Sequence, residues 1–305
     1  MRKKILIITS SYDKTCDYII KKYSELDFFR FDIDQFSEYR VTFTSKGFQI
    51  NSTNCYIDSL TCLSIYFRKP IMENLDGIFE DDYHSYIHKE TYSMIEGIVE
   101  SFRGVVLTKP SIMRRANNKI YQASIATDAG FISPEFSITN NITELNYFTN
   151  IKGIIKPLAI GEITKNSKKE FVQTNLIDSS YKTDKFQYSP VYLQDYIDKE
   201  YEVRVTIVDK HIYPVKICSD NNVDWRKPNN KVIYEICLIP EEIKNSCFKF
   251  MKSCSMNFGC FDFIVKNNIW YFLEMNANGQ WAWLEIEMGL DISKSIIDFL
   301  TNDII

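Results

Sequence analysis

The segment Cys260–Asn276, CFDFIVKNNIWYFLEMN, constrains the fold most strongly, because two strand-like runs flank a short polar connection that contains two asparagines. Alternate residues of a strand share a face, so Glu274 and Asn276 point the same way. Both end a run that otherwise has the apolar character of a buried strand, and burying a carboxylate without a partner costs several kcal/mol. These two side chains therefore face either water or a positive charge.

The register of this predicted hairpin decides whether a third oxygen donor joins them. Asp262 lies opposite Glu274 if the loop has three residues, Asn267–Ile269, or if the hairpin contains an equivalent bulge. A two-residue turn at Asn267-Asn268 instead places Asp262 opposite Leu273 and sends the carboxylates to different faces. In the first register three oxygen donors converge, a set that suits Mg²⁺. A solvated strand face is the alternative that spacing alone leaves open.

Positively charged side chains recur on other strand-like runs, each next to apolar residues and not in a charge cluster. They are Lys156, Arg204, Lys216 and Arg226. Taken singly, each is explained as a surface residue whose stem packs on apolar neighbours. Taken together with an acidic metal face, they describe a phosphate site, because metal ions and cations neutralise the charge of phosphoryl transfer.

The composition is ordinary for a globular protein, with 45% hydrophobic and 25% charged residues in a chain of 305, so we expect two or three subdomains. The net charge of −4 argues against nucleic-acid binding through a basic surface. No apolar run approaches the ~18–20 residues of a membrane span. The start, MRKKILIITSS, is better explained as a buried strand than as a signal peptide. The eight cysteines include no CxxC pair, which predicts reduced thiols in a cytoplasmic protein.

Residues 1–110 alternate strand-like and helical runs and predict an α/β domain. From Ser111 the pattern changes to α+β, with a helix over Ala116–Ala129 and a strand at Gly153–Leu158. The polar segment Gly161–Glu170 after that strand has the character of a flap. The last third, 191–305, is mostly strand-like, with helices predicted over Glu241–Met256 and after Asp291.

Several motifs together resemble one family. DFI and FLEMNANGQW are similar to the metal-binding end of ATP-grasp ligases, and FRKP, NKIYQ, EVRVTIV and DWR are similar to motifs of the graspetide synthetases, which are ATP-grasp maturases of ribosomal peptides. The resemblance implies an ATP-grasp fold with three subdomains: an N-terminal pre-ATP-grasp domain (1–110), a central subdomain (111–190) and a C-terminal subdomain with the metal site (191–305). Arg68 of FRKP meets either an acidic peptide or a neighbouring carboxylate, and both readings stay open.

The resemblance also implies roles for individual residues. Asp262, Glu274 and Asn276 match the Mg²⁺ ligands, while Lys119 and Lys156 match lysines that contact the ATP phosphates. The linker that holds adenine corresponds to Gln194, Asp195 and Tyr196, and Glu202 matches the ribose-binding acid. Lys216 and Arg226 match cations near the transferred phosphate, and Arg204 matches the arginine near the acyl phosphate. The flap segment is poorer in glycine than many ATP-grasp loops, so no role is assigned within it.

The implied activity is an ATP-dependent ligase that phosphorylates Asp or Glu side chains of a precursor peptide, with leader and core, and closes them onto Ser, Thr or Lys as esters or amides. A homodimer is a further expectation from the family, and neither a nucleic-acid nor a membrane partner is expected. Two alternatives remain: a ligase of free amino acids or small carboxylates, and a degenerate module that only binds nucleotide or peptide.

Overall fold

The N-terminal sheet is parallel, with strand order β2-β1-β6-β7, in the computed structural model, which describes residues 3–159, 161–165, 168–171, 174–177, 185–221 and 230–301. Its strands are β1 (Lys4–Thr9), β2 (Phe28–Asp32), β6 (Cys62–Phe67) and β7 (Val105–Val106). Helices cover both faces, which explains the continuous apolar runs of these strands. The covering helices are α1 (Lys14–Lys22), which packs with Ile5 and Ile7, and α2 (Asp81–Ser101), which packs with Leu6 and Ile8.

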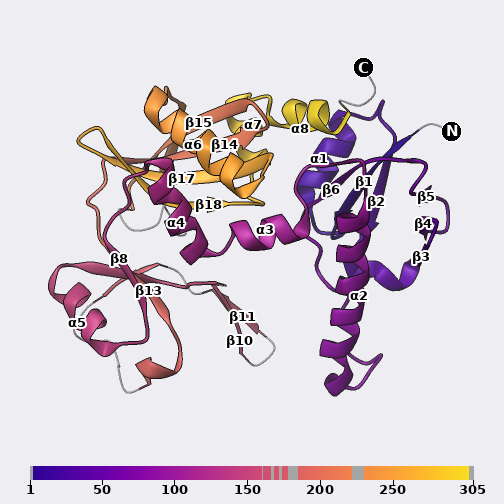
Figure 1. The fold of residues 1–305 in the computed structure, drawn as a ribbon, viewed down its shortest axis with the longest axis horizontal. Helices are drawn as coiled ribbons and strands as arrows, with labels where there is room; N and C mark the ends of the chain where they lie inside the picture. Colours follow the sequence, from indigo (N-terminus) through magenta and orange to yellow (C-terminus); the bar gives the residue numbers. More distant parts are fainter. Residues whose placement is uncertain are drawn as a thin grey trace.

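A small antiparallel sheet flanks this domain, and a helix then leads away from it. The sheet consists of β3 (Arg40–Thr44), β4 (Gly47–Asn51) and β5 (Tyr56–Asp58), preceded by the 3₁₀ helix η1 (Ile33–Glu38). Helix α3 (Pro110–Ala116) crosses from the N-terminal sheet to the rest of the molecule (Figure 1). The helix predicted over Ala116–Ala129 begins later, as α4 (Lys119–Ala129), because the Asn118 side chain accepts hydrogen bonds from two amides of its first turn.

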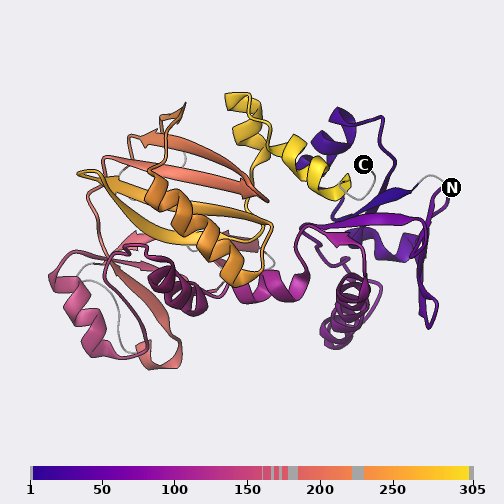
Figure 2. The ribbon, with the colours of Figure 1, turned by 45° about the horizontal axis from the view of Figure 1, so that its top comes forward.

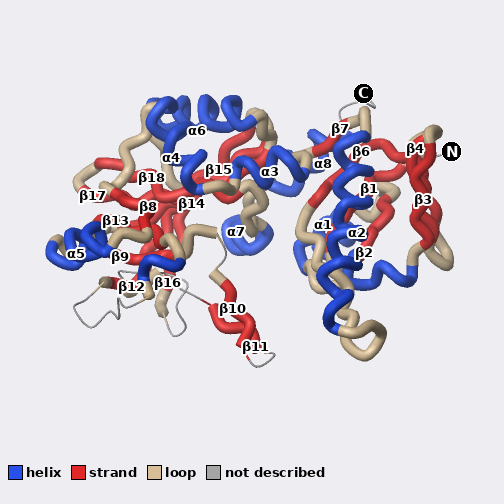
Figure 3. The backbone as a smooth tube through the Cα atoms, turned by 60° about the horizontal axis from the view of Figure 1, so that its bottom comes forward, coloured by secondary structure: helices blue, strands red, loops and turns tan. Residues whose placement is uncertain are grey.

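The central sheet has the order β12-β9-β13-β8. Its strands are β8 (Phe136–Thr139), β9 (Gly153–Lys156), β12 (Asn175–Leu176) and β13 (Val191–Asp195). Helix α5 (Ile142–Asn150) packs on it through Leu145 and Phe148. The predicted flap forms an antiparallel pair, β10 (Glu162–Lys165) and β11 (Lys168–Phe171), which projects from this part of the molecule (Figure 3). The short 3₁₀ helix η2 (Phe186–Tyr188) precedes β13.

The C-terminal sheet is antiparallel, with the order β16-β15-β14-β17-β18. Its strands are β14 (Tyr201–Val208), β15 (His211–Ser219), β16 (Val232–Ile236), β17 (Phe258–Lys266) and β18 (Ile269–Asn276). Helix α6 (Glu241–Cys254) covers one face of this sheet (Figure 2). On that face Phe250 packs edge-on against Phe261. Part of the opposite face carries polar side chains of β14, β17 and β18, and the end of that face at Val208 packs against the C-terminal helices.

The end of the chain returns to the N-terminal sheet. Helices α7 (Ala282–Met288) and α8 (Ile292–Thr301) follow β18, and α8 lies beside α1 and β6 (Figures 1 and 2). The predicted apolar stripe of the last helix is buried, from Ile292 to Leu300. Among the described helices, none has both the length and the apolar character needed to cross a membrane.

Candidate active site

The β17–β18 hairpin brings Asp262 opposite Glu274, as one of the two predicted registers requires. The connection is a two-residue turn, with Asn267 at φ 50° and Asn268 at φ 61°. Both asparagines occupy the left-handed region that such a turn needs. A bulge then shifts the register between Asp262 and Phe263, and Leu273 is the extra residue. The three-residue loop is therefore wrong, but the equivalent bulge restores the predicted pairing.

Asp262, Glu274 and Asn276 form one hydrogen-bonded cluster with Arg204. Arg204 lies opposite Asp262 on β14, and its Nη1 is 3.0 and 3.3 Å from the two carboxylate oxygens. The Asn276 amide nitrogen donates to Asp262 Oδ2 at 3.0 Å and to Glu274 Oε1 at 3.4 Å. The two carboxylates and the amide thus lie within reach of a common cation.

Arg204 is almost completely buried, with 7% of its surface exposed. Burial would lower the pKa of its guanidinium, but the Asp262 carboxylate raises it above its ordinary value, so the side chain stays charged. Its Nε is buried and has no hydrogen-bond partner in the part of the chain that the structure describes. Gly279 leaves room for the group: a Cβ there would lie 2.8 Å from Arg204 Nη2 and 2.5 Å from Cys260 Sγ. An unpaired buried donor at this position is suited to an anion.

Two lysines approach the same cluster from the central part of the chain. Lys119, at the start of α4, lies with Nζ 3.5 Å from Glu274 Oε2 and donates to Pro157 O at 2.8 Å. Lys156, at the end of β9, donates to Gln194 Oε1 at 3.0 Å and lies 4.2 Å from the centre of the Tyr192 ring. Burial lowers the pKa of Lys156 to about 8; the Glu274 carboxylate opposes this, and Lys119 adds to it. A phosphate bound beside Lys156 would raise this pKa again and so favour the charged form of the lysine.

The predicted adenine linker lies at the end of β13, and two of its side-chain atoms lack partners. Gln194 Nε2 and Asp195 Oδ1 are buried without a hydrogen bond. Burial, and to a lesser extent the Glu135 carboxylate, raises the pKa of Asp195. Tyr196 carries the Lys152 ammonium 4.1 Å from its ring centre. Because consecutive residues of a strand point to opposite faces, these two atoms lie on different sides of β13, and each needs a partner of its own.

Glu202 lies on β14, two residues before Arg204, and forms an ion pair with Lys199. Alternate positions on a strand share a face, so Glu202 lies on the same face as Arg204. The structure thus brings Glu202 to the sheet face of the acidic cluster.

Lys216 lies elsewhere. It pairs with Val203 on β14, and Val203 belongs to the buried face that α6 covers. Lys216 Nζ lies 3.2 Å from Glu235 Oε2 and 4.7 Å from the centre of the Tyr201 ring. Since Arg204 is one position out of phase with Val203, the two cations are on opposite faces of the sheet. This corrects the predicted position of Lys216 beside the transferred phosphate. Arg226 falls outside the described residues.

Gln122 is a positioning residue to which the sequence analysis assigns no role. Its Nε2 donates to Met275 O at 2.7 Å and to Ala116 O at 2.8 Å, and its Oε1 accepts from Met275 N at 2.8 Å. Next to it, Asn117 Oδ1 accepts from Ala277 N at 3.0 Å. Met275 lies between the two candidate metal ligands of β18. Gln122 and Asn117 therefore fix the backbone of the strand that carries those ligands.

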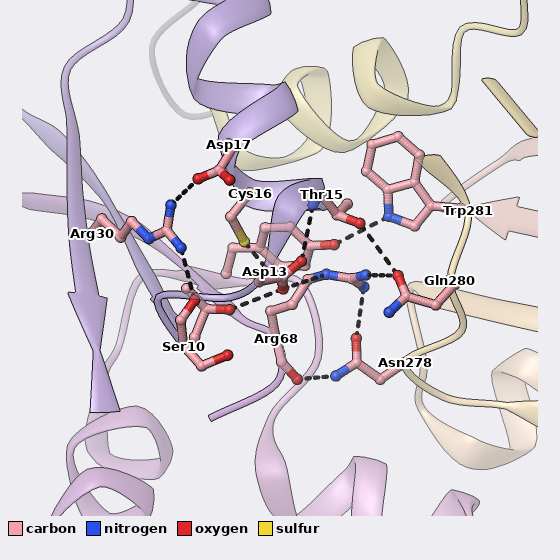
Figure 4. Close-up of polar contacts among 12 residues, drawn as sticks. Ser10, Asp13, Thr15, Cys16, Asp17, Arg30, Arg68, Asn278, Gln280 and Trp281 are labelled. Carbon is pink, nitrogen blue, oxygen red and sulfur yellow. Dashed lines mark hydrogen bonds and ion pairs between the residues drawn. The ribbon is translucent and has the colours of Figure 1, made fainter. Parts of the chain in front are cut away.

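Arg68, which forms a buried ion pair within the N-terminal domain, connects that domain by hydrogen bonds to the segment after β18. Arg68 is 1% exposed, and its Nε donates to Asp13 Oδ2 at 3.1 Å. Its two terminal nitrogens donate to Asn278 Oδ1 at 3.1 Å and to Gln280 Oε1 at 2.6 Å, and its carbonyl accepts from the Asn278 amide (Figure 4). Burial would raise the pKa of Asp13, but Arg68 and hydrogen bonds from Thr9, Cys16 and Thr15 hold it below its ordinary value. Of the two readings of Arg68, the neighbouring carboxylate is the one observed.

The geometry fits a metal-bound nucleotide. Carboxylate and amide oxygens suit Mg²⁺, and lysines lie on the side of the central sheet. Unpaired buried atoms occur at Gln194, Asp195 and Arg204, at the two ends of the site. Such orphaned groups are costly unless a ligand pairs with them.

Two family models match consecutive parts of the chain. Residues 4–114 match the model of the MvdD pre-ATP grasp domain, and residues 116–300 match that of the RimK-like ATP-grasp domain. A comparison with curated proteins finds no match.

Solved structures similar to the chain along its whole length include two from Microcystis aeruginosa. The macrocyclase MdnC bound with precursor peptide MdnA has a TM-score of 0.88 and 24% identity, covering 98% of this chain and 99% of that chain. The macrocyclase MdnB has a TM-score of 0.82 and 26% identity, with 98% and 99% covered. A Chryseobacterium gregarium RiPP-associated ATP-grasp ligase, in complex with ADP and a leader and core peptide, has a TM-score of 0.86 and 25% identity, with 99% and 97% covered.

Proposed function

The chain is a ligase of the RimK-like ATP-grasp family, and from that premise we propose that it activates side-chain carboxylates of a ribosomally made precursor peptide and closes them into rings. The products are esters or amides between Asp or Glu and Ser, Thr or Lys. The observation that carries the proposal is the cluster of Asp262, Glu274 and Asn276 around Arg204, whose Nε is buried without a partner.

ATP and Mg²⁺ fit residues on both sides of this cluster. Asp262, Glu274 and Asn276 would hold Mg²⁺, which supplies neutralisation of the phosphate oxygens when bound. Lys119 and Lys156 lie where they would contact the phosphates, since both lysines neighbour Glu274. We assign adenine to the linker at the end of β13 and ribose to the acidic residue of β14. The linker residues are Gln194, Asp195 and Tyr196, and the acid is Glu202.

The proposed chemistry proceeds in two displacements. A carboxylate oxygen of the peptide attacks the γ-phosphorus of ATP, and the bond to ADP breaks, which leaves an acyl phosphate. A hydroxyl or amine of the same peptide then attacks the acyl carbon, releasing phosphate and one proton. Arg204 binds the anionic acyl group during both steps, because the Asp262 carboxylate keeps its guanidinium charged despite burial. For Arg226 the role near the phosphate is proposed from the resemblance alone.

Positioning accounts for most of this chemistry, so the reaction needs no side-chain nucleophile. The buried hydrogen bonds between Gln122 and Met275 support a mechanism based on positioning, because they leave strand β18, which carries the proposed metal ligands, little freedom to move. The peptide substrate is supported by the relatives, since MdnC and the Chryseobacterium gregarium ligase were each solved with a peptide and resemble this chain over its length. A cytoplasmic location and a homodimer are part of the same proposal, as is the three-subdomain division at residues 110 and 190.

Co-expression with small peptides encoded beside the gene, followed by mass spectrometry, tests the proposal. We expect the loss of one water for each ring closed. Glu274→Gln should abolish this loss, whereas Glu242→Gln, an exposed glutamate on α6, should leave it unchanged. Peptides that stay unmodified, together with ADP release driven by free amino acids, would favour the ligase of small carboxylates. Nucleotide binding without turnover of any acceptor would favour a binding module.

A further inference from the structure

Lys69 stands at the end of β6, where the parallel N-terminal sheet faces the rest of the molecule. Ligands of parallel sheets bind outside the carboxyl ends of the strands. β6 ends at Phe67, and Lys69 is two residues further on. Pro70 follows it and disfavours the helical region for the backbone of Lys69. Its side chain is half-buried.

The ion pair of the neighbouring residue brings Lys69 to the Arg204 end of the site. Arg68 donates to Asn278 and to Gln280, the two residues on either side of Gly279. Gly279 in turn lies against Arg204, since a Cβ on it would be 2.8 Å from Arg204 Nη2. The end of β6 is therefore held directly beside the arginine assigned to the acyl phosphate.

The two arginines at this junction each have a carboxylate partner. Arg68 pairs with Asp13, and Arg204 pairs with Asp262. Lys69 forms neither a hydrogen bond nor an ion pair with any part of the chain that the structure describes. Burial lowers the pKa of Lys69, and the charges of Arg68 and Arg204 lower it further, while Asp13 and Cys260 oppose the shift. The positive charge of Lys69 is thus less favourable here than in water, and a bound anion would offset that cost.

Among the described residues, two donors at this junction have no acceptor: Lys69 Nζ and the buried Nε of Arg204. One anion between them would satisfy both. Because they belong to different domains, an anion held by both would also draw the N-terminal sheet onto the C-terminal sheet.

We infer that Lys69 and Arg204 form a two-sided binding site for the acyl phosphate, with Lys69 contributed by the N-terminal domain. The inference rests on the proposed function, and it adds a substrate-contacting residue that lies outside the ATP-grasp subdomains. An acyl phosphate carries two negative charges on its phosphate oxygens, whereas a carboxylate carries one. Two cations therefore complement the acyl phosphate better than they complement a carboxylate.

Calorimetry with acetonylphosphonate tests the inference without the natural peptide. This probe is an isostere of acetyl phosphate whose phosphonate group cannot be transferred, because a P–C bond replaces the P–O bond. Its dissociation constant is measured for the full chain saturated with Mg-ADP. We expect Lys69→Met to weaken probe binding by about tenfold or more, the loss expected for a hydrogen bond to a charged group. Lys69→Arg should retain most of the affinity, and Lys46→Met, at an exposed lysine in the β3–β4 turn, should retain all of it.

The outcomes separate this inference from the proposed function. Failure of the wild-type chain to bind Mg-ADP would contradict the proposed function itself. Normal Mg-ADP binding with equal probe affinity in wild type and Lys69→Met would overturn the role of Lys69, as would no probe binding to wild type. A structural role would instead show as a change in Mg-ADP affinity or in urea unfolding of Lys69→Met, and we expect neither.

Discussion

Gly279→Ala is the substitution whose consequence can be worked out most fully. The new Cβ would lie 2.5 Å from Cys260 Sγ, 2.6 Å from Cys260 Cβ and 2.8 Å from Arg204 Nη2. Neither neighbour moves freely, because Cys260 is completely buried on β17 and Arg204 is held by Asp262. Since Gly279 does not adopt a positive φ, the effect is steric and comes from the added methyl group alone.

The expected cost is that of overpacking, about 1–3 kcal/mol in the free energy of unfolding. The smaller entropy of the unfolded alanine variant returns about 0.4–1 kcal/mol, so the net change is destabilising. The rate of ligation should fall by about 10²–10³-fold, the loss expected when one preorganised hydrogen-bond donor of the active site is displaced. Mg-ATP binding should survive, since the clash is at the Arg204 end and not at the lysines.

Urea unfolding, Mg-ATP calorimetry and peptide-dependent ADP release measure these three effects. Gly97→Ala is the matched control, because a Cβ there meets nothing within 4 Å on an exposed position of α2. It should stabilise the protein by about 0.5–1 kcal/mol and leave activity unchanged. Full ADP release by Gly279→Ala would refute the reasoning that Arg204 must occupy its observed position.

Three further predictions concern the Gln122 hydrogen bonds, the phosphate contacts and the metal. Gln122→Leu removes the side-chain partners of the Met275 N–H and C=O. The free energy of unfolding should then drop by about 1–3 kcal/mol for each group left unpaired, which urea unfolding measures. Mg-ATP affinity should fall as pH rises through about 8, where Lys156 loses its proton, and Lys156→Arg should flatten this profile in calorimetry across that range. Glu274→Gln should abolish ADP release while its urea unfolding stays close to wild type, because it removes charge without removing volume.

The convergence of Asp262, Glu274 and Asn276 could be predicted from sequence because it depends on local spacing. Glu274 and Asn276 share a face in any strand, and the pair of asparagines at 267–268 predicts a turn. What could not be predicted was how the register is reached, since a turn of two residues with a bulge at Leu273 gives the same pairing as a longer loop. Both solutions keep the apolar face of β18 against the core.

Lys216 shows why the other predictions were less secure. Its run, HIYPVKI, is apolar on both sides of the lysine, so the pattern does not reveal which face of the strand is buried. A shift of one residue moves a side chain to the opposite face. Here the register with β14 places Lys216 with Val203, on the side that α6 covers.

Long-range polar contacts were beyond the sequence for a different reason. Gln122 reaches Met275, and Arg68 reaches Asn278, across more than half the chain. The one signal for Gln122 is a polar residue on the buried stripe of α4, alongside Ile125 and Ala126. A buried amide in a helix demands partners, but composition and periodicity do not identify them.

The central claim is that this site transfers the γ-phosphoryl group of ATP to a peptide carboxylate before the ester or amide bond forms. Peptide labelled with a heavy oxygen isotope in its Asp and Glu carboxyl groups, incubated with the protein and Mg-ATP, tests it most directly. The account predicts one labelled oxygen in the released phosphate for every ring closed, and neither rings nor labelled phosphate with Glu274→Gln. Ring closure with unlabelled phosphate would contradict it.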